Sequence, residues 1–453
     1  MPSKHLSLRE RVAGAATGVT LSLLKEVAGA TSGKPLSRMG RAFSSRNYRL
    51  YFTGQGLSMI GTWMTLIATN WLVFQLTHSA LLLGVVGFAG QIPTFFLAPF
   101  AGVVVDRWPR HRILIVTQIL AMLQSLALAF LALTGMINIW YIIFLSIFQG
   151  LINALSMPAL QAFVKEIVEK QEDLGNAIAL NASLISSARL IGPAIGGLLI
   201  AAFGAGVCFL IDGISYIAVL VALLSMKFVP SKLAVQTLPP WQRLITGFNY
   251  AFGFPPIRSV LLMMALLGFL GLPYVVLSPI FATDILHGGA ETLGFLMAAS
   301  ALGALIASVY LSYRSSVVGL ENIIALAPRF WGIGFIVFSL SHILGFSLIV
   351  MVAIGFGVVL QIAACNTFIQ TIVEDDKRGR VMSFYSMAFM GMVPFGSLLS
   401  GWLASQIGAP YTLMINGTFG ILGSLLFAKH LPVLTSLVRP IYKEIGLLPK
   451  VQS

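Results

Sequence analysis

The sequence has 453 residues, of which 57% are hydrophobic and only 9% are charged. Soluble domains carry about 25% charged residues, so this composition excludes a soluble globular protein and indicates several membrane-spanning segments. The formal net charge of +13 does not indicate binding to nucleic acid. The basic residues lie in short loops and near the N-terminus, where the preference of cytoplasmic loops for Lys and Arg explains them.

The sequence shows no pattern typical of a metal site or of a nucleotide-driven pump. Cys208 and Cys365 lie inside apolar segments, where each is expected to pack as a small hydrophobic residue. The six histidines are scattered, and no phosphate-binding loop of the G-x-x-x-x-G-K-[ST] type occurs. We therefore expect no disulfide framework, no metal and no cofactor.

Residues 1–45 are polar and basic and precede the first apolar run. Ser7 and Glu10 have capping-box spacing, and apolar residues then recur near one helical face. This pattern predicts a short amphipathic helix that rests on the inner leaflet. Gly14 and Gly18 interrupt the apolar residues, which argues against a signal peptide and leaves an organelle transit peptide as the alternative.

After residue 45, apolar runs long enough to cross a bilayer as helices recur at regular intervals. We predict an all-α membrane protein with twelve transmembrane helices in two six-helix halves. The first half, 46–227, contains spans 50–76, 81–105, 113–134, 138–162, 179–203 and 207–227. The second half, 259–430, contains spans 259–284, 291–313, 322–343, 346–371, 383–405 and 411–430.

The remaining segments and the basic residues predict the topology. The proline-rich connection 228–258 is expected to carry an interfacial helix, WQRLITGFNYAF, and residues 431–453 a cytoplasmic tail. With both termini in the cytoplasm, every Lys and Arg lies on the inner side except Arg189 and Arg329, which fall inside predicted helices. The positive-inside rule therefore predicts this orientation in the plasma (inner) membrane.

The two halves resemble each other in sequence. A shift of 204 positions pairs glycines in the fifth and sixth helices with glycines in the eleventh and twelfth. The pairs include Gly175 with Gly379, Gly192 with Gly396, Gly197 with Gly401, and Gly213 with Gly417. This register indicates a tandem duplication, which is the plan of a large class of secondary transporters with a binding site between the halves.

Two motifs resemble signatures of the major facilitator superfamily. GVVVDRWPRHR at 102–112 resembles its loop 2–3 signature but has Pro109 where a glycine is usual and His111 where a base is usual. The matching positions are Gly102, Asp106, Arg107, Arg110 and Arg112. RLIGPAIGG at 189–197 resembles the fifth-helix antiporter signature, although Ala188 replaces its first glycine.

Three further stretches, 46–64, 281–294 and 378–401, are similar to the branch of this superfamily that includes the enterobactin exporter. The resemblance covers roughly residues 44 to 430. It is specific for the fold and the family and says much less about the substrate. It implies alternating access between two rocking halves, in a protein that we expect to act as a monomer.

The loop 102–112 is a candidate conformational gate. Asp106 is expected to cap a neighbouring helix end or to pair with arginines across the cytoplasmic ends of the halves. Such contacts contribute about 1 kcal/mol each, which biases two conformers without locking one. The alternative is a basic turn that only sets topology. The corresponding region of the second half, at Tyr313 and Arg314, has lost most of the pattern, so the two halves would contribute unequally to this gate.

The fifth-helix signature combines close-packing glycines with a charged residue. Gly192, Pro193, Gly196 and Gly197 have the spacing of a helix–helix contact, interpreted as either a hinge that seals a leak path or ordinary tight packing. Arg189 is costly within a span and is expected to face a cavity or a partner. Contact with an anionic substrate, snorkelling to the membrane surface and pairing at the cytoplasmic ends remain alternatives.

Asp212 is the only acidic residue that we expect well inside a helix, and it is the candidate for proton coupling. However, the internal repeat pairs Asp212 with Asn416, whose amide does not titrate. A structural role as a hydrogen-bond acceptor is therefore the competing interpretation.

Polar residues on the first, fourth, seventh and tenth helices are candidates for the substrate cavity, because these helices line the cavity of the fold that the chain resembles. They are Gln55, Thr62, Gln149, Asn153, Tyr274, Gln361 and Asn366, with Ser58 and Gln370 nearby. Each one alone is equally explained by an interhelical hydrogen bond of about 0.6 kcal/mol. As a set they favour a large amphipathic substrate.

The sequence therefore predicts a secondary active exporter of small amphipathic organic molecules, siderophore-like or drug-like, driven by protons. The expected partners are the lipid bilayer, the small-molecule substrate and protons. A lysophospholipid or lipid flippase of the same fold and a non-transporting membrane scaffold are the alternatives. An enzyme is not expected, because the spans contain no cluster of catalytic side chains.

Overall fold

The computed structural model describes residues 41–168, 171–226, 248–314 and 316–448. Within them, twelve helices are long and apolar enough to cross a membrane, which confirms the predicted fold. The predicted amphipathic helix before residue 41 lies outside the described residues. Most of the predicted interfacial helix also lies outside them, although 248–253 at its end is helical.

Six helices form the N-terminal half. After a 3₁₀ turn, η1 (Arg41–Ser44), they are α3 (Arg46–Thr77), α4 (Ala80–Arg107), α5 (Arg110–Leu133), α6 (Ile139–Ile167), α7 (Leu174–Phe203) and α8 (Ala205–Ser225), with a short turn η2 (Gln171–Asp173) before α7. Inside this half, α3 packs against α7 and α8, α5 packs against α6 and α8, and α4 packs against α6.

The C-terminal half also has six spans, two of which are interrupted. The seventh span consists of α10 (Pro255–Leu266), η3 (Leu267–Gly271), α11 (Tyr274–Ile280) and η4 (Phe281–Ile285), and the eleventh consists of α15 (Asp375–Met390) and α16 (Val393–Ile407). The uninterrupted spans are α12 (Ala290–Tyr313), α13 (Leu320–Ser339), α14 (Leu344–Ile372) and α17 (Ala409–Glu444).

Polar caps explain where some helices begin. The hydroxyl of Ser79 accepts a hydrogen bond from the Leu82 amide at 3.3 Å, and the side chain of Asn138 accepts one from the Tyr141 amide at 3.1 Å. These bonds satisfy amide groups that have no partner within the helix.

The sharp turns between the fifth and sixth helices of each half have the same geometry. Gly204 joins α7 to α8 with a φ of +82°, and Gly408 joins α16 to α17 with a φ of +87°. Residues with a side chain rarely adopt this conformation, so glycine is required at both positions. The two glycines are 204 positions apart, in the register of the sequence repeat, which supports the duplication.

The final helix is longer than the sequence predicts. We expected the span to end at residue 430, yet α17 continues through Pro432 to Glu444. Its extension packs onto the start of α13, where the buried Tyr442 donates a hydrogen bond to Glu321 at 3.4 Å. Packing against this neighbour therefore outweighs the local preference of proline to end a helix.

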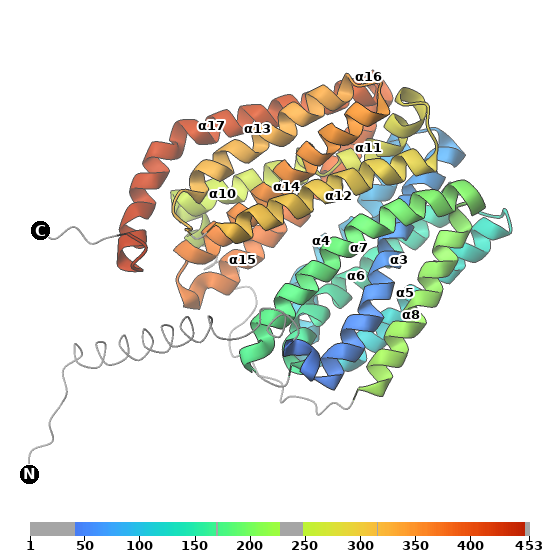
Figure 1. The fold of residues 1–453 in the computed structure, drawn as a ribbon, viewed down its shortest axis with the longest axis horizontal. Helices are drawn as coiled ribbons and strands as arrows, with labels where there is room; N and C mark the ends of the chain where they lie inside the picture. The colour runs from blue at the N-terminus through green and yellow to red at the C-terminus, as the bar shows by residue number, and fades with distance from the viewer. Residues whose placement is uncertain (1–40, 169–170, 227–247, 315, 449–453) are drawn as a thin grey trace, which may run out of the picture.

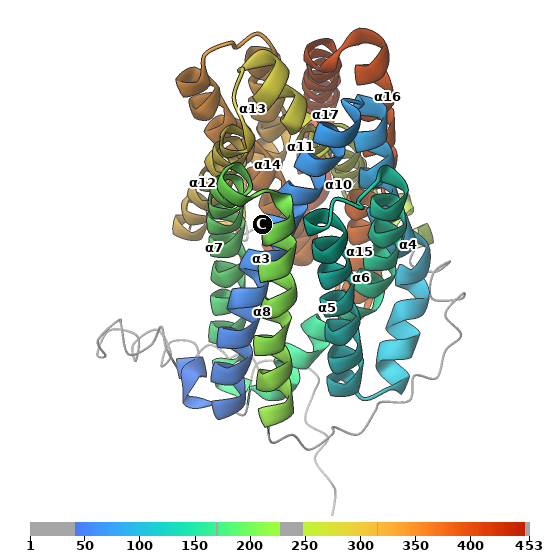
Figure 2. The ribbon, with the colours of Figure 1, turned by 90° about the vertical axis from the view of Figure 1, so that its right-hand side faces the viewer.

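The two halves meet along two helix pairs. Helix α7 lies against α12, and α4 lies against α16 (Figure 2). In Figure 1 the two halves approach each other at the upper right and diverge toward the lower left, between the end of α17 at the left and the start of α3 at the bottom. We call this diverging end the basic end, because it carries Arg107, Arg110 and Arg112; the other is the opposite end.

Candidate functional site

The closest approach between the halves is made by glycines near the opposite end. Between α4 and α16, a Cβ built on Gly84 of α4 would lie 2.6 Å from the carbonyl oxygen of Ser397 and 2.9 Å from the Cα of Gly401, both on α16. Real Cβ atoms do not approach backbone atoms so closely. Only glycine therefore allows α4 and α16 to pack at this distance.

Helices α7 and α12 pack in the same way. A Cβ built on Gly197 of α7 would lie 2.7 Å from the carbonyl oxygen of Ala290 and 2.9 Å from the Cα of Gly294, both on α12. Gly197 and Gly401 are equivalent in the sequence repeat. We call the two crossings, Gly84 with Gly401 and Gly197 with Gly294, the glycine seam.

The sequence identified only part of the glycine seam. Gly197 and Gly401 were found through the repeat and the helix-5 signature, whereas Gly84 and Gly294 were not. Gly84 and Gly294 are 210 positions apart, so they fall outside the 204-residue register. A separate comparison of the second and eighth helices, at a shift of 210 positions, would have paired them.

The helix-5 signature packs against both halves. Gly192 and Gly196 face α3, where a Cβ on Gly192 would lie 2.6 Å from the Cβ of Trp63. Gly197 faces α12, and the carbonyl oxygen of the buried Pro193 would lie 2.6 Å from a Cβ on Gly294. The signature thus joins the first helix of its own half to the eighth helix of the other half.

The gate candidates lie at the basic end. Gly102, Asp106 and Arg107 belong to the end of α4, and Arg107 is exposed. Arg110 and Arg112 belong to the first turn of α5. Arg112 is exposed, and Arg110 forms an ion pair with Glu166 of α6. Among the described residues, the ion pair made by this loop, Arg110 with Glu166, therefore joins two helices of the N-terminal half.

Arg189 lies halfway along α7, on the same helix as the glycine seam. Its guanidinium group stacks over the ring of Trp63 on α3, with 5.6 Å between the guanidinium carbon and the ring centroid. The side chain is partly exposed. The structure thus brings Arg189 and Trp63 together near the middle of α7.

Asp212 is buried between three helices of the N-terminal half. One carboxylate oxygen, Oδ2, accepts hydrogen bonds from the hydroxyl groups of Thr65 on α3, at 2.9 Å, and Ser125 on α5, at 3.0 Å. The other oxygen, Oδ1, has no hydrogen-bond partner among the described residues and faces the backbone of Gly61. The repeat-related Asn416 is also buried and donates to Ser400 at 3.1 Å.

The cavity candidates divide into two groups. Gln361 is fully buried inside the C-terminal half, where it accepts a hydrogen bond from Trp331 Nε1 at 2.7 Å and donates one to the carbonyl oxygen of Met263 at 2.8 Å. Tyr274 is buried beside Ser300, with 2.7 Å between the two hydroxyl oxygens. Both side chains lie inside their half, away from the space between the halves.

Gln55 also points into its own half. It is buried and lines a void of about 10 Å³ together with Gln118. The candidate cavity residues that keep accessible surface are Thr62, Gln149, Asn153 and Asn366. The face that a polar residue shows depends on how each helix is rotated in the bundle, which its spacing in the sequence does not fix.

Replacing Gln361 with leucine is expected to destabilise the protein by about 2–4 kcal/mol. The change leaves the buried N–H of Trp331 without a partner, which costs about 1–3 kcal/mol. It also removes one hydrogen bond, of about 1 kcal/mol, from the carbonyl group of Met263, which keeps its bond from the Leu267 amide. Asn366→Leu on the same helix is the control, because Asn366 keeps accessible surface and is expected to cost less than about 1 kcal/mol. Unfolding temperatures of the purified variants in detergent measure the difference, and equal losses would contradict this assignment.

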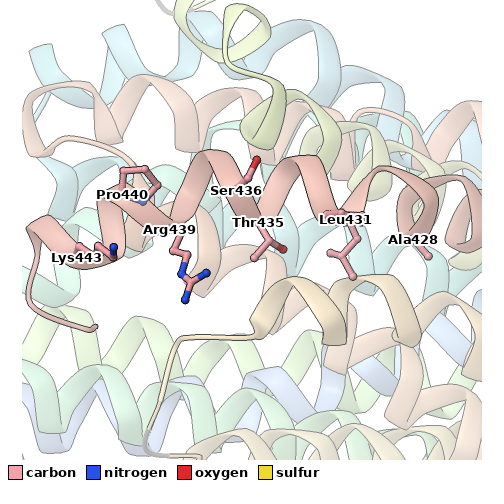
Figure 3. Close-up of a pocket in the computed structure, with 8 residues that line it drawn as sticks. Ala428, Leu431, Thr435, Ser436, Arg439, Pro440 and Lys443 are labelled. Carbon is pink, nitrogen blue, oxygen red and sulfur yellow. The ribbon is translucent and has the colours of Figure 1, made fainter. Parts of the chain in front are cut away.

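A groove of about 610 Å³ lies along the extension of α17 (Figure 3). The residues around it include Leu431, Thr435, Arg439 and Lys443, and Figure 3 shows them on this single helix. The groove therefore lies on the surface of the C-terminal half and does not separate the two halves.

Comparisons with known proteins agree with this architecture. Residues 41–439 match the family described as transmembrane secretion effector. The staphyloferrin A transporter of Staphylococcus aureus is 28% identical, over 84% of this chain and 95% of that protein. Macrolide efflux protein A of Streptococcus pyogenes is 22% identical, over 82% and 94%. The enterobactin exporter of Shigella boydii is 24% identical, over 83% and 89%.

Solved structures share the fold at low sequence identity. The nucleoside transporter NupG superposes with a TM-score of 0.67 and 13% identity, covering 85% of this chain and 98% of that one. At this identity the similarity concerns the arrangement of the helices alone.

Proposed function

Because this chain belongs to the transmembrane secretion effector family, within the major facilitator superfamily, we propose that it exports small amphipathic organic molecules by alternating access. It is a multi-pass inner-membrane transporter of small molecules and not an enzyme. The relatives named above as siderophore and macrolide transporters support a siderophore-like or drug-like cargo.

The glycine seam is the observation that carries the proposed mechanism. It joins the halves through two backbone crossings, formed by four glycines near one end, while the halves diverge toward the other (Figure 1). We assign both termini and the basic end to the cytoplasm, so this conformer faces inward. In the outward-facing conformer the glycine seam opens and the gate residues Gly102 to Arg112 close the basic end.

Three elements complete the proposal. Residues 46–227 and 259–430 rock as two bodies, tethered by 228–258, and residues 1–45 and 431–453 stay in the cytoplasm. Thr62, Gln149, Asn153 and Asn366 contribute to the substrate cavity. Proton entry drives export through Asp212, whose burial and unpaired oxygen support this role.

Export is tested by comparing the medium and the interior of cells with and without the protein. Cells are grown iron-starved and iron-replete and analysed by untargeted mass spectrometry. The expected result is a compound that appears outside only when the protein is present and accumulates inside when it is absent. A double substitution, Asn153→Trp with Asn366→Trp, should abolish the difference by filling the cavity. Identical profiles in every condition and after challenge with a macrolide would contradict the proposal.

A further inference from the structure

An arginine near the middle of a helix long and apolar enough to span the membrane has no acidic partner in the described part of the chain. Arg189 lies midway along α7 (Leu174–Phe203), which at 1.5 Å per residue places it roughly 20 Å from either helix end. The ion pairs between described side chains are Arg110 with Glu166 and Lys377 with Glu374, and neither involves Arg189.

This placement is energetically costly. An arginine in the middle of a membrane-spanning helix is costly by insertion scales. The cation–π contact with Trp63 offsets only part of this cost, and the residue also loses rotamer freedom when it is held over the ring. The guanidinium is therefore stabilised only in part by the protein itself, and an anion would complete its coordination.

The neighbouring residues of α7 show where Arg189 points. One turn further along the helix, Gly192 faces α3, and the carbonyl oxygen of Pro193 lies next to Gly294 on α12 of the other half. Positions three and four residues after Arg189 lie on either side of its own direction on the helix surface. The side chain therefore points into the angle between the two halves, on the basic side of the crossing of Gly197 with Gly294.

An aromatic and an aliphatic side chain lie next to Arg189. Trp63 flanks it on α3, and Ile185, one turn before Arg189 on α7, exposes 39% of its surface. A cation between apolar walls complements a molecule with one anionic group and a hydrophobic body. The guanidinium fork matches a carboxylate, which it binds through two parallel hydrogen bonds.

We propose that Arg189 and Trp63 form the binding site for a carboxylate group of an amphipathic organic anion. This inference rests on the proposed transport function and specifies the class of cargo. The carboxylate enters from the basic end, pairs with Arg189 below the closed glycine seam, and places its apolar body against Trp63. Opening of the crossing at Gly197, two turns away on the same helix, then exposes the bound anion to the opposite side.

Arg329 is the matched control. It also lies inside a span, on α13, but its Nε donates to the hydroxyl of Ser424 on α17 at 2.8 Å. That contact holds the guanidinium between two helices of the C-terminal half. Neutralising Arg329 should therefore leave the preference for an anion unchanged, whereas neutralising Arg189 should abolish this preference.

The test measures binding of two probes that share one ring system, naphthalene-2-carboxylate and naphthalene-2-methanol. Isothermal titration calorimetry is performed on the purified full-length chain in lipid nanodiscs. We expect the wild type and Arg329→Gln to bind the carboxylate at least tenfold more tightly than the alcohol. Arg189→Gln should bind both equally, and Arg189→Lys, which keeps the charge without the fork, should retain a smaller preference.

Equal binding of the two probes by the wild type overturns the inference, and so does an undiminished preference in Arg189→Gln. If Arg189→Gln does not fold, the wild-type preference and the reduced preference of Arg189→Lys decide the matter. Export in cells is scored separately. Export of neutral compounds without any carboxylate preference would refute this inference and leave the proposed function intact, whereas an absence of all export would refute the proposed function.

Discussion

Replacing Gly401 with leucine is expected to reduce export at least tenfold and to open the glycine seam. A Cβ at this position would lie 2.7 Å from the carbonyl oxygen of Ala80 and 2.7 Å from the Cα of Gly84, so the larger side chain has to push α4 and α16 apart. Backbone atoms on both sides leave no flexible side chain to move away. The conformer with a closed glycine seam is therefore destabilised relative to one in which the halves separate at this end.

The opening is best measured at the other crossing, away from the substitution. Ala290 is buried beside Gly197, so Ala290→Cys should react slowly with a membrane-impermeant maleimide in an otherwise native seam. Because the proposed cycle moves each half as one body, adding Gly401→Leu should raise the labelling rate at least tenfold. Both native cysteines are buried and are replaced with alanine to remove background labelling.

Gly345→Leu is the control for Gly401→Leu. Gly345 lies in the first turn of α14, where a Cβ would meet nothing within 4 Å. This variant should export normally and should leave labelling of Ala290→Cys unchanged. An unchanged labelling rate in Gly401→Leu, with the protein folded, would show that the glycine seam is static packing and not a gate.

The second large effect is expected for Asp212→Asn, which should abolish uphill transport while preserving downhill exchange. Asparagine has nearly the same shape and can still accept hydrogen bonds from Thr65 and Ser125. Asn416 occupies the repeat-related position, so the fold tolerates an amide there. An amide does not take up a proton, however, and coupling through this position is lost.

Proteoliposomes with an imposed pH gradient measure this difference, using the cargo identified in the cell assay. Accumulation against the cargo gradient should fall at least tenfold, while counterflow without a pH gradient stays within about twofold of the wild type. Undiminished accumulation in Asp212→Asn would assign Asp212 a purely structural role.

Asp212→Leu separates the structural role from the coupling role. Leucine removes the acceptor for Thr65, and its branched side chain would press against Gly61, whose Cα lies at the crossing of α3 and α8. A loss of about 2–4 kcal/mol of stability is expected from the unpaired hydroxyl and the overpacking. A lower unfolding temperature for the leucine variant than for the asparagine variant would show this.

The sequence predicted the helices well because membrane insertion imposes a strong local constraint. A span needs about twenty apolar residues, and this requirement is visible without tertiary information. The extension of α17 was missed for the opposite reason. Pro432 and Pro440 argue locally for a helix end, and only contact with α13, through residues such as Tyr442, shows that the helix continues.

The candidate site was predictable only in part. Arg189 and Asp212 stood out because charged residues inside spans are rare, and the structure places both at positions that need explaining. Gln361 had an equally suitable sequence position, yet it lies inside the C-terminal half. A polar residue on a membrane helix gains from any hydrogen-bond partner, so its presence alone does not show whether it faces a ligand or a neighbouring helix.

In the proposed cycle, the two ends differ in their sensitivity to salt. The glycine seam consists of close contacts between backbones, whose strength does not depend on dissolved ions. The proposal has charged side chains close the basic end, and their attraction fades beyond about 8 Å at physiological ionic strength. A rise in salt at the basic end is therefore expected to weaken one closure and to spare the other. The proposal thus predicts that ionic conditions on that side change the fraction of time that the protein spends open there.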